Sequence, residues 1–233
     1  MSMDRSDNRR SAGTGLVILL ASFVISALCF CGAGTAMASG LVRAGLAERI
    51  QAAYGGIRDA SGTFVQQSHL KDLGRTETFG GDFMLKLPGR MRYIYTAGSR
   101  DQVIIKGDVI TIYQEKEAQI LKSRFNTGTY GTAPVAFLGG LGNIKRDFNL
   151  SEKNGKLILT PKNRMSGVTF ITVEPSNGPF PIKSFSIHDR YENTVRITLK
   201  NVKLNGGIKD SIFEFAPPPG THVFDYTQPQ TDD

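Results

Sequence analysis

A change in hydrophobic period constrains this 233-residue chain more than any other feature. Residues 41–54 carry apolar side chains, among them Leu46, Ile50 and Tyr54, at the three- and four-residue spacing of a helix with one apolar face. The Gly55-Gly56 pair marks the end of this helix. Beyond it, apolar residues recur at every second position for most of the chain, which is the period of a β-strand. We therefore expect one short helix followed by a long series of strands.

The alternating segments predict about ten strands in a single antiparallel meander. The clearest lies at residues 195–200, where Val, Ile and Leu alternate with Arg, Thr and Lys. Short turns such as Pro88-Gly89 separate the strands. Residues 134–141 break the pattern and predict a second, short helix that begins with Pro134. The last dozen residues are polar, and we expect them to be frayed.

A sheet of this size needs a cover for its apolar face. Large sheets twist and curl, and two short helices are too small to cover the face densely. Three arrangements solve this problem: the sheet folds over itself as a sandwich, closes into a barrel, or stays open and curved with the helices in its mouth. Only the last two leave a cavity for an apolar ligand. The periodicity alone leaves all three open.

The first 38 residues have the pattern of a secretory signal. Three arginines precede an apolar run at residues 16–30, and Ala36-Met37-Ala38 has the small-x-small pattern that precedes a cleavage site. We expect cleavage after Ala38, which leaves residues 39–233 as one exported domain. The alternative is an uncleaved membrane anchor, since the apolar run is only slightly shorter than the ~20 residues that span a bilayer.

The sequence contains no recognisable catalytic or metal-binding motif. Both cysteines, Cys29 and Cys31, lie in the predicted signal, and the three histidines, His69, His188 and His222, lack metal-ligand spacing. Neither a Gly-x-Ser-x-Gly motif nor a phosphate-binding loop occurs. We therefore expect no enzyme activity and no cofactor. The net charge of +7 is spread along the strands without a basic tract, so we expect no nucleic-acid partner.

A series of short motifs resembles the periplasmic outer-membrane lipoprotein carriers of the LolA type. The matching segments are Gly62–Gln67, Gly81–Tyr93, Val103–Tyr113, Leu157–Lys162 and Phe213–Gly220. Each motif is weak by itself, whereas their order and spacing are specific. Together with the first helix they cover nearly the whole chain that follows the predicted signal.

The resemblance implies a mainly-β fold with a few helices: an unclosed antiparallel β-barrel, or curved half-barrel, with an α-helical lid over an apolar concave face. It also implies a periplasmic chaperone for acylated lipoproteins. An inner-membrane ATP-driven lipoprotein-releasing transporter would load it, and an outer-membrane acceptor would unload it. We expect a monomer. The alternative is a periplasmic binding or sensor module of the same fold, for another lipid or for a membrane signalling partner.

One position departs from the family's pattern. Some members carry Arg immediately before the Pro of the third-strand turn, where it hydrogen-bonds to the lid and holds the empty pocket closed. Leu87 occupies that position here, and a Leu side chain cannot donate those bonds. Closure of the lid would then rest on apolar contacts or on other donors.

Strand alternation and the resemblance together select candidate lipid-binding residues. On the concave face we expect Phe64, Phe83, Leu85, Met91, Tyr93, Ile105, Ile112, Phe170, Phe185, Ile187, Val195 and Ile197. In the lid we expect Leu46, Ile50, Val135, Phe137, Leu138 and Leu141. A one-residue register error would turn a whole strand around, so the assignments within each strand depend on one another.

Overall fold

The computed structural model describes residues 45–124, 137–140, 144–163 and 167–227. The helices are α1 (Leu46–Gly55), α2 (Phe137–Gly140) and α3 (Ile144–Asp147), and a 3₁₀ turn, η4, spans Asp210–Phe213. The strands are β1 (Asp59–Leu70), β2 (Arg75–Lys86), β3 (Arg90–Ala97), β4 (Gln102–Lys106), β5 (Val109–Gln114), β6 (Gln119–Arg124), β7 (Phe148–Lys153), β8 (Lys156–Pro161), β9 (Val168–Pro175), β10 (Ile182–Asp189), β11 (Thr194–Leu204) and β12 (His222–Tyr226).

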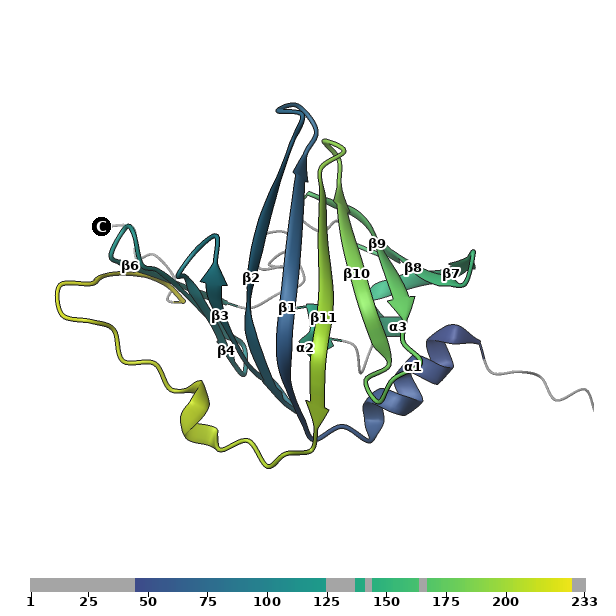
Figure 1. The fold of residues 1–233 in the computed structure, drawn as a ribbon, viewed down its shortest axis with the longest axis horizontal. Coiled ribbons are helices and arrows are strands. Elements are labelled where there is room, and N and C mark those ends of the chain that lie inside the picture. The colour runs from purple at the N-terminus through teal and green to yellow at the C-terminus, as the bar shows by residue number, and fades with distance from the viewer. Residues whose placement is uncertain (1–44, 125–136, 141–143, 164–166, 228–233) are drawn as a thin grey trace, which may run out of the picture. The chain divides into compact units, whose positions relative to one another are not determined.

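All the described strands join one sheet in the order β12-β6-β5-β4-β3-β2-β1-β11-β10-β9-β8-β7 (Figure 1). The strands β12 and β7 stand at its two edges, so the sheet is curved but unclosed. This confirms the mainly-β fold of an open half-barrel with a few helices. None of the helices within the described ranges is long and apolar enough to cross a bilayer.

The strand connectivity differs from the single antiparallel meander that the alternation predicted. Two meanders, β1–β6 and β7–β11, meet where β11 returns to pair with β1. The edge strand β12 pairs with β6 in parallel, with His222 opposite Gln119 and Tyr226 opposite Ser123. The expectation that the last dozen residues are frayed is therefore wrong for residues 222–226, which form β12. A parallel strand needs a long crossover, which a local hydrophobic period does not reveal.

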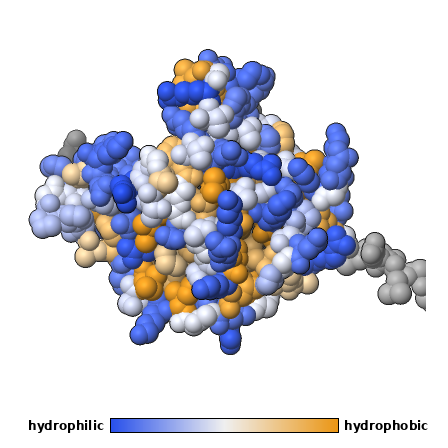
Figure 2. Space-filling model, in the orientation of Figure 1, coloured by the Kyte–Doolittle hydropathy of each residue, from blue (hydrophilic) through white to orange (hydrophobic). Residues whose placement is uncertain are grey.

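The main core lies between the concave face of the sheet and the helices. Alternate residues of each strand enter it: Phe83 and Leu85 of β2, for example, have no exposed surface. Gly81 on the same strand allows a close approach of β3, because a Cβ atom there would lie 2.1 Å from the carbonyl oxygen of Ile94. In the orientation of Figure 1, α2 and α3 lie behind the long strands β1, β2, β10 and β11. Figure 2 shows that the opposite, viewer-facing side of the molecule mixes hydrophilic and hydrophobic residues, with many of the hydrophobic ones in its lower half.

A second, smaller apolar layer lies on the outer face of the sheet. Residues 205–221, which we call the C-terminal strap, run from β11 to β12 and include η4. Phe213 of the strap is 1% exposed, and Phe215 packs on Tyr113 with their ring centroids 5.1 Å apart. Outward-facing Ile104 and Ile120 are also buried. The strap thus covers the outer side of β4, β5 and β6.

Basic residues of β2–β4 hold the strap in place. Lys86 Nζ lies 2.6 Å from the Asp210 carboxylate, and Lys106 Nζ lies 2.6 Å from that of Glu214. Arg92 donates hydrogen bonds to the carbonyl oxygens of Ile212 (2.7 Å) and Glu214 (3.3 Å). Exposed ion pairs contribute little individually. The buried Phe213 therefore provides most of the attachment, and the polar contacts fix its register.

Candidate functional site

The concave core gathers nearly all the side chains that the sequence selected for it. Nine of the twelve are buried in one cluster: Phe64, Phe83, Leu85, Met91, Tyr93, Ile105, Phe185, Ile187 and Ile197. Two more, Ile112 and Val195, are partly buried and pack against that cluster. These residues lie far apart in sequence, and the curvature of the sheet brings them onto one surface.

Phe170 is a correction to the predicted concave face. It lies opposite His188 in the β9–β10 pair and stacks on that imidazole with ring centroids 4.2 Å apart. Its neighbour Ile171 is fully buried and lies opposite the buried Ile187, so Phe170 faces outward. A bulge in β9 causes the change: Asp189 and His188 of β10 pair with Val168 and Phe170, which leaves Thr169 as an extra residue. Val168 and Ile171 therefore both point inward although they are three positions apart.

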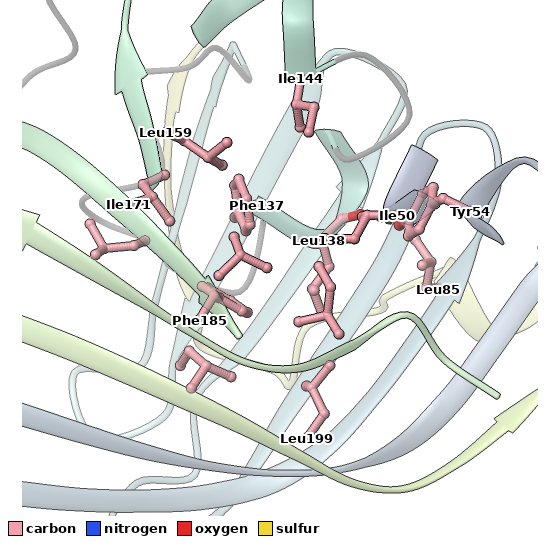
Figure 3. Packing of buried hydrophobic residues seen from close by; sticks show 14 of the residues in the cluster. Ile50, Tyr54, Leu85, Phe137, Leu138, Ile144, Leu159, Ile171, Phe185 and Leu199 are labelled. Atoms are coloured by element: carbon pink, nitrogen blue, oxygen red, sulfur yellow. Dashed lines mark hydrogen bonds between the residues drawn. The ribbon is translucent and has the colours of Figure 1, made fainter. Parts of the chain in front are cut away.

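The predicted lid residues that the structure describes enter the same core. Leu46 and Ile50 of α1 and Phe137 and Leu138 of α2 are all at most 4% exposed. The Phe137 ring lies 5.0 Å from Phe185 between centroids. Figure 3 shows Phe137 surrounded by side chains of the sheet. Val135 and Leu141, the other predicted lid residues, lie outside the described residues.

A buried hydroxyl joins the two helices of the lid. Tyr54, near the end of α1, is 1% exposed and donates a hydrogen bond to the carbonyl oxygen of Leu138 in α2. Its ring packs edge-on against Phe180 at 6.0 Å. The Leu87 side chain has no hydrogen-bond donor. The donor to α2 is instead the hydroxyl of Tyr54, which lies on the other lid helix. The sequence selected Tyr54 only as a helix residue, although a tyrosine on an apolar helix face signals a hydroxyl that needs a partner.

The sequence also missed much of the concave face on the β7–β9 side. The additional buried residues there are Phe148, Leu157, Leu159, Ile171 and Val173. The alternation at residues 157–159 was visible and could have placed Leu157 and Leu159 on this face. Ile171 could not be assigned in the same way, because the shift that inverts Phe170 affects it too.

A chain of neutral polar groups lies at the edge of the core. The Tyr95 hydroxyl donates to Gln66 Oε1 at 2.9 Å, and Gln66 Nε2 donates to Ser68 Oγ at 3.1 Å. Burial raises the pKa of Tyr93 and of Tyr95 above the ordinary tyrosine value, which keeps both hydroxyls protonated. The described residues contain no group of three His, Cys, Asp or Glu side chains that could hold a metal ion. The surface between lid and sheet is thus suited to apolar contact.

A cavity of about 420 Å³ opens beside the Tyr54–Leu138 contact. It lies between α1, the β2–β3 turn and α2, and its lining includes Tyr54, Ile57, Leu87, Pro88 and Gly139. Leu87, at the position that departs from the family's pattern, therefore lines a mostly apolar opening at the edge of the lid, which Arg58 also lines.

The sequence profile of the family described as "Outer membrane lipoprotein carrier protein LolA" matches residues 56–216. The chain belongs to the LolA family. An outer-membrane lipoprotein carrier protein of Ralstonia nicotianae is 26% identical over 206 residues, which cover 80% of this chain and 94% of that protein. The carrier of Neisseria meningitidis serogroup B is 24% identical over 201 residues, which cover 84% and 94%.

Among solved structures, a LolA superfamily protein from Nitrosomonas europaea aligns with a TM-score of 0.44 and 10% identity, over 73% of this chain and 96% of that one. The match to the family profile spans strands β1–β11 and residues 205–216 of the strap. The resemblance inferred from short motifs is therefore confirmed at the level of the family.

Proposed function

We propose that this protein shields the acyl chains of lipoproteins between its lid and its concave sheet, and carries them through the periplasm. The observation that supports this most is the burial of α1 and α2 side chains in a core formed by one face of an unclosed sheet. A lid of two helices can separate from such a sheet without breaking any strand pair. Family membership supports the same cargo, since the relatives are named lipoprotein carriers.

The energetics of the cargo require a carrier. Each buried methylene contributes roughly 0.8 kcal/mol, so a ~16-carbon chain left in water costs on the order of 12 kcal/mol. Phe137 and Leu138 occupy the space between the sheet and α1. An entering acyl chain replaces their apolar contacts with its own. The net gain is then smaller than the full transfer energy, which allows the chain to leave again.

The Tyr54 hydroxyl stabilises the closed state of the lid in this proposal. Because its acceptor is the Leu138 backbone, separation of α2 from α1 breaks the bond. The cavity lined by Leu87 and Gly139 is the point at which an acyl chain first reaches the lid. Neither a cofactor nor a catalytic step is part of this cycle.

Transport direction and processing belong to the same proposal. Residues 1–38 direct export and are removed, and residues 39–233 act as a single monomeric domain. An ATP-driven inner-membrane transporter supplies the energy for loading. An outer-membrane acceptor with a stronger affinity for the acyl chains takes the cargo.

Site-specific photo-crosslinking tests which face of the sheet touches the cargo. A photoreactive phenylalanine analogue replaces Tyr93, which faces the concave core, or its neighbour Ile94, which faces outward and serves as the matched control. The probe is a synthetic peptide with an N-terminal palmitoyl chain. The proposal predicts crosslinking from position 93 and little from position 94. Equal crosslinking from both positions, or none from position 93 in a folded protein, would overturn it.

A further inference from the structure

An apolar row crosses the concave face from the core to the edge of the sheet. Cross-strand partners define it, because each of its residues lies directly opposite the next. From β2 to β12 the row consists of Phe83, Tyr93, Val103, Ile112, Leu121 and Phe224. Every member is apolar or aromatic, so the row is continuous across six neighbouring strands.

The last two members of the row face the same side as the core. On β6 and β12, the neighbouring residues Ile120 and Val223 line a cavity of about 430 Å³ beneath the strap, on the outer side of the sheet. Side chains alternate between the two faces of a strand. Leu121 and Phe224 therefore lie on the concave side, and Val223 lies on the outer side.

Burial declines steadily along the row. Phe83 and Tyr93 are fully buried, and Val103 is 6% exposed. Ile112 and Leu121 are of intermediate exposure, and Phe224 is 44% exposed. The core therefore fills the row at β2 and β3 and leaves it uncovered at β12. Tyr226, two residues beyond Phe224 on the same face, is 59% exposed and widens this apolar edge.

We propose that this row is a track for one acyl chain, which lies across β4–β6 with its end against Phe224 of β12. The idea rests on the proposed function and adds a specific path and chain length to it. Three strand spacings separate β4 from β12, a distance of about 14 Å. Half the hydrocarbon core of a bilayer, which one acyl chain spans, measures about 15 Å. A long chain thus reaches the exposed end of the row, and a chain of half that length does not.

A pair of neighbouring substitutions tests the track. Phe224→Asp places a charge at the end of the row, and Val223→Asp places the same charge on the same strand but on the outer face. Both side chains are exposed, at 44% and 50%, so both variants are expected to fold, which circular dichroism verifies. Affinities are measured for peptides carrying an N-terminal 16-carbon or 8-carbon acyl chain.

We expect Phe224→Asp to weaken binding of the 16-carbon peptide about tenfold and to leave the 8-carbon peptide unchanged, because only the longer chain loses its last apolar contacts. Val223→Asp should change neither affinity by more than about twofold. Phe224→Leu, which keeps an apolar side chain at the end of the row, should bind the 16-carbon peptide as tightly as the wild type does. Equal affinities of the wild type and Phe224→Asp, or equal losses in both Asp variants, would refute the track while the carrier function stands. Failure of the wild type to bind either peptide would refute the carrier function itself.

Discussion

At the scale of single residues, Tyr54 shows how one polar atom can control an otherwise apolar lid. The two lid helices meet through the core, where apolar contacts have little directionality. The hydrogen bond from Tyr54 to the Leu138 carbonyl adds a directional contact between them. A buried hydrogen bond contributes about 1 kcal/mol net, enough to shift an open–closed equilibrium about fivefold.

Replacement of Tyr54 by Phe should therefore favour the open lid. The ring keeps its contact with Phe180, and only the hydroxyl is lost. We expect about fivefold tighter binding of a palmitoylated peptide and a loss of about 1 kcal/mol in the free energy of unfolding. Fluorescence titration and urea denaturation measure the two effects. Tyr191→Phe, at a tyrosine that is 56% exposed, is the control, and an affinity identical to that control would contradict the role of Tyr54.

A second residue-scale prediction concerns acid stability. The Glu174 carboxylate accepts hydrogen bonds from Lys183 Nζ (2.8 Å), Ser184 Oγ (3.0 Å) and Arg196 Nη2 (2.9 Å), and so ties β9 to β10 and β11. The hydrogen bond from Lys183, above all, lowers the pKa of Glu174 from 4.5 to about 2. Ionised Glu174 therefore stabilises the fold above about pH 4.5, and this contribution is lost as the pH falls toward 2.

Glu174→Gln should flatten this part of the stability profile. The free energy of unfolding of the wild type should fall by about 1 kcal/mol more than that of the variant between pH 4.5 and pH 2, a value reduced for solvent screening at a partly exposed site. Chemical denaturation at a series of pH values measures it. Glu117→Gln, at an exposed position between β5 and β6, is the control. Parallel profiles for the wild type and Glu174→Gln would show that the carboxylate contributes nothing.

At the scale of elements, α2 is deeply buried, yet the pairing of the strands does not depend on it. It is only four residues long, and the sheet is held together by hydrogen bonds between strands, to which α2 does not belong. Its side chains Phe137 and Leu138 are nevertheless fully buried. The sheet can therefore stay folded when α2 leaves the core, as a lid requires.

A charge on α2 should separate these two properties. In Leu138→Asp or Phe137→Asp, the carboxylate cannot pack against the core or against a bound acyl chain without a large cost, so α2 should not close over the chain and acyl-chain binding should be abolished. Circular dichroism should still report the sheet. Asn149→Asp, at an exposed position of β7, controls for the added charge. Undiminished binding of a palmitoylated peptide by a folded Leu138→Asp variant would show that α2 is not the lid.

The elements differ in how far the sequence alone predicted them. Inward faces of β2, β3 and β10 were predictable because strand alternation is local and each strand is regular. The prediction for Phe170 was wrong because a register shift at one end of β9 changes the alternation, and no residue in the sequence marks that shift. The pairing of β1 with β11 and the parallel β12 depend on contacts more than a hundred residues apart, which no local pattern encodes.

At the scale of the whole sheet, the two faces have different roles. The strap covers the outer face. Its Phe213 is buried on the β4–β6 side of the sheet, and its acidic side chains pair with Lys86 and Lys106. The concave face has only short helices as its cover among the described residues. A rigid outer layer keeps the curvature of the sheet while the cover on the inner side changes. This division is what a reversible carrier of apolar chains requires.

Native mass spectrometry tests this account most directly. The protein is purified without detergent from cells that make acylated lipoproteins, and the mass of the intact complex is recorded. We predict an adduct with the mass of an acylated lipoprotein, absent from the Leu138→Asp variant. A phospholipid adduct in its place would favour a lipid-binding module of the same fold over a lipoprotein carrier. Unliganded protein alone, even after incubation with a palmitoylated peptide, would contradict the central claim that the concave core opens to hold acyl chains.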